Sequence, residues 1–140
     1  MDIPLFSIFS AISEIFVTIG VLYAIFTTLN GKPFPKVLLG SVILFEFCVN
    51  VVYMASMAAK ADRGSELSQG MKLFFAGHGT LSLLMFLTLA VLYFISLVDV
   101  AKGREPWFRR HRTGSYVLVA FWMVSVLTGE AIFVMRYLMA

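Results

Sequence analysis

The sequence predicts an all-α integral membrane protein, a single domain of residues 1–140 built from four antiparallel transmembrane helices. Of its 140 residues, 60% are hydrophobic and only 14% are charged, whereas a soluble domain carries about 25% charged residues. The apolar residues are gathered into four long runs that are separated by short polar segments. Because about 20 apolar residues in a helix cross roughly 30 Å of hydrocarbon, each run is long enough to span a bilayer.

The four predicted spans cover residues 4–29, 36–59, 71–98 and 113–139. The first ends at NGKPFPK (30–36), whose glycine and two prolines disfavour continuation of the helix. The second ends at the polar segment KADRGSELSQG (60–70). The third ends at DVAKGREPWFRRHR (99–112), where a proline and a tryptophan are typical of a membrane interface. The first run is too long for the core of a signal peptide and lacks a preceding basic segment, so we expect no cleavable signal.

Lysines and arginines are divided unevenly between the two ends of the predicted bundle. Seven of them lie in loops 30–36 and 99–112, and the opposite end has four: Lys60, Arg63, Lys72 and Arg136. By the positive-inside rule, we expect these two loops in the cytoplasm and both termini outside. The membrane is then expected to be the cytoplasmic membrane of a bacterium or archaeon.

A layer of polar side chains is predicted inside the spans: Glu14, Glu46, Asn50, His78 and Glu130. At a rise of 1.5 Å per residue, four of them lie about 10–15 Å below the outer face, and Glu46 lies one turn deeper. Ionisable groups at such depth face the bundle interior or a cavity, and they indicate a functional site. We expect Gly77, Gly79 and Gly129 to let the helices approach closely there, with carboxylates of neighbouring helices holding the imidazole.

Three interpretations of this layer are open, and its five members are the candidate residues for binding a cofactor. In the first, Glu14, His78 and Glu130 bind a divalent metal ion, as carboxylate and imidazole ligands do inside helical proteins. In the second, the layer handles protons or binds a quinone headgroup. In the third, it is a hydrogen-bonded cluster of neutral acids that sets the register of the helices and holds no ligand.

Several classes of function are disfavoured by the sequence. The single cysteine, Cys48, excludes an internal disulfide and a cysteine-based metal knuckle. The sequence lacks a nucleophile–base set, a phosphate-binding loop and a nucleotide fingerprint, and we expect no nucleic-acid partner. His78 and His111 lie about 25 Å apart along the membrane normal, so they cannot ligate one haem together. A transporter would need a continuous polar path, yet beyond Glu46 the second span offers only Ser41 before the loop.

Two further groups of side chains are candidates for contacts at the membrane surface. The segment WFRRHR (107–112) is predicted to anchor the protein at the interface, in contact with anionic lipid headgroups or an acidic partner, through Trp107, Arg109, Arg110, His111 and Arg112. At the opposite face, six methionines offer thioethers of the kind that bind Cu(I), although methionine is also an ordinary packing residue: Met1, Met54, Met57, Met71, Met135 and Met139.

The later part of the chain, from residue 50 on, resembles a known family. His78 stands early in the third span, the basic loop ends in HR (111–112), and FWMVSVLTG (121–129) supplies a tryptophan, a serine, a threonine and a glycine at Trp122, Ser125, Thr128 and Gly129. Together with NVVYM (50–54), these residues resemble the YozB/CtaM-like family of small four-helix membrane proteins, which is associated with haem–copper oxidase maturation. The resemblance covers about the last two-thirds of the chain and implies partners among the membrane subunits of a respiratory complex.

The chain departs from this family at both ends of the second span. Members of the family usually carry further histidines there, whereas this chain reads PFPKVLLG (33–40) and YMASMAAK (53–60). These departures imply a related protein with an altered or vacant site, in which Glu14, Glu46 and Glu130 are candidates to have taken over the polar role.

The expected function is a non-catalytic accessory or assembly subunit of a larger respiratory membrane complex, such as a haem–copper terminal oxidase. The alternative is an electron-transfer subunit that shares a haem, copper or quinone with a partner and binds it through His78, Glu14 and Glu130.

Overall fold

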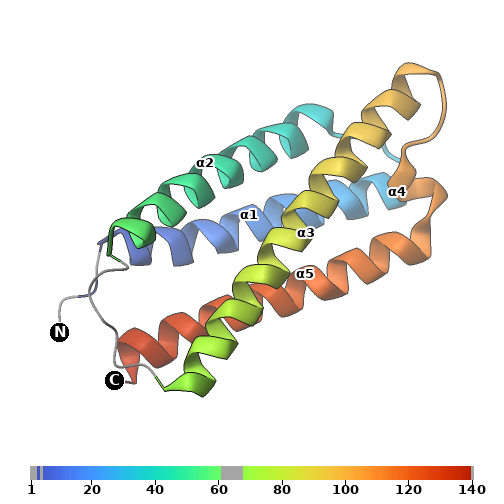
Figure 1. The fold of residues 1–140 in the computed structure, drawn as a ribbon. Helices are drawn as coiled ribbons and strands as arrows, with labels where there is room; N and C mark the ends of the chain where they lie inside the picture. The colour runs from blue at the N-terminus through green and yellow to red at the C-terminus, as the bar shows by residue number, and fades with distance from the viewer. Residues whose placement is uncertain (1–2, 4, 61–67, 140) are drawn as a thin grey trace.

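The computed structural model describes residue 3 and residues 5–60 and 68–139, without the side chains at 54 and 56–60 (Figure 1). The described residues form four long helices with a short helix and a π-helical turn: α1 (Leu5–Leu29), α2 (Lys36–Lys60), α3 (Gln69–Ala101), α4 (Trp107–Arg110), α5 (Arg112–Phe133) and η1 (Val134–Leu138). Four of these segments are long and apolar enough to cross a membrane. The prediction of an all-α membrane bundle is therefore confirmed.

Some residues on which the predictions from the sequence depend lie outside the described residues. They are Arg63, which was counted for the orientation, and Met1, which was counted among the methionines. The side chains of Lys60, Met54 and Met57 are likewise not described.

Helix α3 extends past the predicted span 71–98 at both ends. At its start, Ser68 caps the helix, because its hydroxyl accepts the backbone N–H of Met71 at 3.3 Å. At its other end, the helix stops where Gly103 adopts a φ of 72°, a conformation that glycine takes at little cost. Gly31, with a φ of 83°, follows α1 in the same way. A helix of 33 residues is about 50 Å long, so α3 is longer than the hydrocarbon it crosses.

The four long helices form an antiparallel ring (Figure 1). Helix α1 packs between α2 and α5, and α3 packs against α5 and α2. Among the described residues, no Cα atom of α1 lies within 8 Å of one in α3, and the same holds for α2 and α5. Each of the four long helices therefore presents one face to the interior of the ring.

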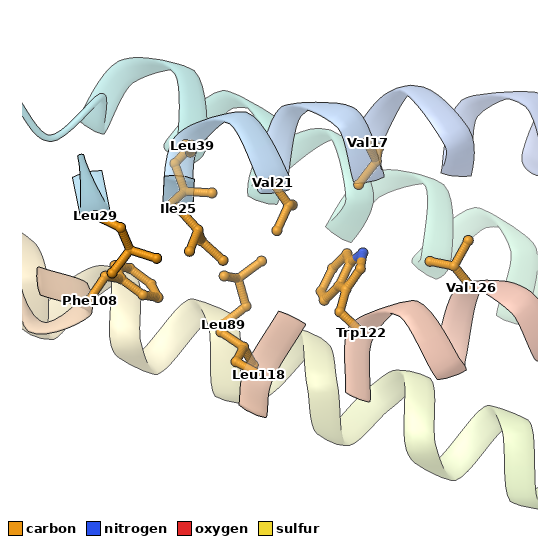
Figure 2. Close-up of a cluster of buried hydrophobic side chains, with 11 residues drawn as sticks. Val17, Val21, Ile25, Leu29, Leu39, Leu89, Phe108, Leu118, Trp122 and Val126 are labelled. Atoms are coloured by element: carbon orange, nitrogen blue, oxygen red, sulfur yellow. The ribbon is translucent and has the colours of Figure 1, made fainter. Parts of the chain in front are cut away.

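The apolar core is small and comes mainly from α1 and α5 (Figure 2). Among the side chains that the structure describes, α2 contributes only Leu39 to it, and α3 contributes only Leu89, which is 1% exposed. In the most apolar stretch of α2, 6% of the residues are buried, against 17–22% in the other three spans. Most of the surface of α2 is thus left for lipid or for another protein.

Two arginines of the segment 107–112 donate hydrogen bonds to backbone carbonyls at and just after the end of α1. Arg109 donates from Nε to the carbonyl of Thr28 at 2.9 Å and from Nη2 to that of Lys32 at 2.5 Å. Arg112 donates to the carbonyl of Leu29 at 2.8 Å. Carbonyls in the last turn of a helix lack partners within the helix, and a positive charge beside them is favourable.

The third arginine of this segment ties it to α3. Arg110 forms an ion pair with Asp99, which is 5% exposed. Trp107 stacks on His111 with ring centroids 4.8 Å apart, and its backbone N–H donates to Ser96 at 3.2 Å. The arginines that were expected to contact lipid or a partner thus bind the chain's own backbone and one buried aspartate.

Arg109→Ala is expected to lower the free energy of unfolding by about 1.5–3 kcal/mol, the usual contribution of hydrogen bonds from a charged group. The measurement is unfolding in detergent micelles followed by circular dichroism. Arg104→Ala is the control, because that arginine is exposed and its side chain has no hydrogen bond among the described residues. Equal stability of the two variants would mean that the hydrogen bonds from Arg109 to the end of α1 do not stabilise the fold.

Candidate functional site

The four long helices enclose a small polar cavity. Its volume is about 20 Å³, and polar side chains of each helix line it: Glu14 from α1, Glu46 and Asn50 from α2, Ser82 from α3 and Ser125 from α5. Met85, Phe86, Trp122 and Val126 complete the wall. The structure therefore brings together Glu14, Glu46 and Asn50 of the predicted layer, with serines of the other two helices.

Hydrogen bonds within this layer connect the helices in pairs. Ser82 and Ser125 share a hydrogen bond of 2.8 Å, which joins α3 to α5. Trp122 donates from its indole nitrogen to the hydroxyl of Thr18 at 3.2 Å, which joins α5 to α1. Within α2, Asn50 donates to Glu46 at 3.2 Å, one turn away along the helix. Hydrogen bonds between membrane helices contribute about 0.6 kcal/mol each on average.

His78 is held by a threonine of α5. Its Nδ1 lies 2.8 Å from the hydroxyl oxygen of Thr128, and that hydroxyl donates to the carbonyl of Ser125 at 2.9 Å. A threonine hydroxyl has a single proton to give, so the imidazole must donate from Nδ1, which leaves Nε2 for another contact. The expectation that carboxylates hold this imidazole is corrected, because its direct partner is a hydroxyl group.

Gly129 is a glycine of the predicted layer at which the helices approach closely. A Cβ atom at this position would lie 2.9 Å from Cε1 of His78, 3.2 Å from its Nε2 and 3.3 Å from Oε2 of Glu14. The imidazole of α3 and the carboxyl group of α1 therefore both lie close to the backbone of α5 at this glycine. Beside Gly77 and Gly79, in contrast, a Cβ would have nothing within 4 Å. The expectation of close approach is right for Gly129 and wrong for the two glycines that flank His78.

The carboxyl groups of the layer have no basic partner among the described residues. The ion pairs found there involve other acids, Glu105 and Asp99. Glu14 lies within electrostatic range of both Glu46 and Glu130. Oε1 of Glu130 is buried and makes no hydrogen bond with the described residues. Such an orphan polar atom is uncommon in proteins and is often met by an ordered water molecule.

The size of the cavity limits what the layer can hold. About 20 Å³ admits a single water molecule, whereas pockets for small molecules and cofactors measure about 300–1,000 Å³. A haem or a quinone headgroup does not fit inside this cavity. Among the described residues, no group of three or more His, Cys, Asp or Glu side chains is placed to hold a metal ion. His78, Glu14 and Glu130 do not form such a group, and we do not propose a metal there.

Sequence reasoning missed Thr18 and Phe86. Thr18 is buried and lies one turn after Glu14 on the same face of α1, so the i, i+4 spacing was an available signal. Phe86 carries no such signal, because its place between the cavity and the outer surface depends on how α2 and α3 pack.

Comparison of the chain with protein-family models, with curated proteins and with solved structures finds no match.

Gly129→Ala is expected to destabilise the protein by about 1–3 kcal/mol, the cost of overpacking a tight contact, because the new methyl group would press on His78. Gly77→Ala is the matched control, since the same methyl group meets open space at this position, next to His78 in α3. The measurement is the midpoint of thermal unfolding in detergent. A Gly129→Ala protein as stable as the control would contradict the close approach of α1, α3 and α5.

Proposed function

We propose that this chain is a non-catalytic accessory or assembly subunit that packs against other integral membrane subunits. The observation that carries the proposal is the exposure of α2, which has the least buried apolar stretch of the four spans. Phe45, Cys48 and Val52 lie on its exposed surface. An apolar surface of this extent fits a partner helix in the membrane, where close packing drives association.

The interior of the bundle supports the same proposal. Its polar groups are largely used in hydrogen bonds between helices, as in the pairs Ser82–Ser125 and His78–Thr128. The space left among them is the size of a water molecule. Hydrogen bonds of this kind stabilise the packing of the helices. This arrangement is consistent with a protein that acts through its outer surface.

The identity of the complex is the more specific part of the proposal. The resemblance to the YozB/CtaM-like family supports a haem–copper terminal oxidase, through His78 and the stretch from Trp122 to Gly129. The excess of positive charge in loops 30–36 and 99–112 supports a cytoplasmic position for both loops, with the termini outside. The membrane proposed is the cytoplasmic membrane of a bacterium or archaeon.

Cross-linking from Cys48 tests the partner surface. Because this cysteine is the only one in the chain and is exposed, it can be labelled with a maleimide–benzophenone in native membranes. Illumination is expected to join it to a subunit of an oxidase or cytochrome complex, identified by mass spectrometry.

The matched control carries Cys48→Ser together with Val124→Cys. Val124 is exposed on α5 and lies as many residues from the start of its helix as Cys48 does in α2, so both labels sit at a similar depth. We expect several-fold less adduct from position 124. Adducts of equal yield from both positions, or none with a respiratory subunit, would count against the proposal.

An electron-transfer subunit is the second candidate, and the position of both His78 and Glu14 beside Gly129 favours it. Since the polar cavity has no room for a haem, the cofactor would have to approach this imidazole from a partner. Under the accessory-subunit proposal, His78→Ala leaves the visible spectrum and metal content of the purified complex unchanged. Loss of a haem band or of a stoichiometric metal would instead assign His78 to a cofactor.

A further inference from the structure

A groove runs along the outside of the bundle between the first half of α2 and the second half of α3. Its volume is about 540 Å³, it is open to the surroundings, and residues 36–47 and 86–94 line it. Its walls are mainly aromatic and aliphatic, and Gly40 adds no side chain to them. At the loop end, the hydroxyl of Tyr93 donates to the carbonyl of Lys36 at 2.8 Å, which holds the two helices together there.

The length of the groove corresponds to one leaflet of a bilayer. Residues 36 to 47 of α2 span about 16 Å at 1.5 Å per residue, and half of the hydrocarbon core is about 15 Å. The inner end lies at Phe47 and Phe86, whose rings stack with centroids 6.5 Å apart. Phe86 also lines the polar cavity, so its ring separates that cavity from the apolar groove.

The length of the groove fits an acyl chain better than a helix. The groove ends halfway along α2, at the stacked rings of Phe47 and Phe86. A transmembrane helix of a partner would continue through the whole hydrocarbon core, about 30 Å, whereas one acyl chain occupies a single leaflet. An acyl chain is therefore a better occupant than a transmembrane helix of a partner.

Positive charge lies at the loop end of the groove. Lys36 lines it and is exposed, and its ammonium group has no ion pair within the part of the chain that the structure describes. Lys36 is also the first residue of α2, a helix of 25 residues, whose N-terminus carries partial positive charge and free N–H groups. Basic pockets between membrane helices bind anionic lipid headgroups. The arginines 109, 110 and 112 are not available for this, because they bind within the chain.

We propose that this groove binds one anionic phospholipid of the bilayer. One acyl chain lies between α2 and α3 and ends at Phe47 and Phe86. The phosphate lies at the ammonium group of Lys36 and the first turn of α2.

Native mass spectrometry of the full chain tests the proposal. The protein is reconstituted with equal amounts of phosphatidylglycerol and phosphatidylcholine, released from detergent, and scored for bound lipid. We expect one bound lipid, with phosphatidylglycerol about fivefold over phosphatidylcholine, because one lysine near the surface contributes about that factor. Lys36→Gln is expected to remove this preference, while Lys102→Gln, an exposed lysine on the same side that does not line the groove, keeps it.

A second pair of variants tests the acyl-chain part of the site. Ala90→Phe fills the groove and is expected to remove most of the bound lipid of both kinds. Ala76→Phe, an exposed alanine of the same helix outside the groove, is expected to bind lipid like the original chain.

Three results would overturn the proposal. They are a chain without bound lipid, the same lipid preference in Lys36→Gln and Lys102→Gln, and release by Ala90→Phe of a co-purified protein subunit in place of lipid. Because Lys36 is exposed and outside the core, the lysine pair decides the question even where Ala90→Phe fails to fold.

Discussion

The structure depends on one constraint, the absence of water in the middle of the bilayer. A polar group placed there has to find its partner inside the protein. The bundle meets this requirement by bringing polar side chains of all four helices to one level, around a cavity the size of a water molecule. Close packing near this level needs a residue without a side chain, and Gly129 supplies it beside His78 and Glu14.

A second set of polar contacts fastens the opposite end of the bundle. Arg109 and Arg112 bind carbonyls at the end of α1, and Arg110 pairs with Asp99 of α3. Between the two sets lies an apolar core that draws mainly on α1 and α5. Helix α2 takes little part in these arginine contacts or in the core. Most of its described side chains face outward.

The polar layer differs from a cofactor site in the space around its side chains. A cofactor site would keep open space beside its ligands, whereas here the imidazole of His78 bonds to Thr128 and the remaining space is small. The hydrogen bonds of the layer join α3 to α5 and α5 to α1, whereas Oε1 of Glu130 is buried without a hydrogen bond among the described residues. The functions proposed above lie outside the bundle, on the exposed face of α2 and in the groove beside Lys36.

The sequence by itself determined the four spans, because the length of an apolar run decides whether a helix can cross a bilayer. It also gave the level of the polar layer, since the rise per residue of a helix is constant. Only the tertiary structure decided that Gly129 and not Gly77 is the point of close approach, and that Arg110 belongs to Asp99. Such choices depend on the rotation and tilt of each helix against its neighbours, which side-chain packing sets and which the spacing of residues along one helix does not contain.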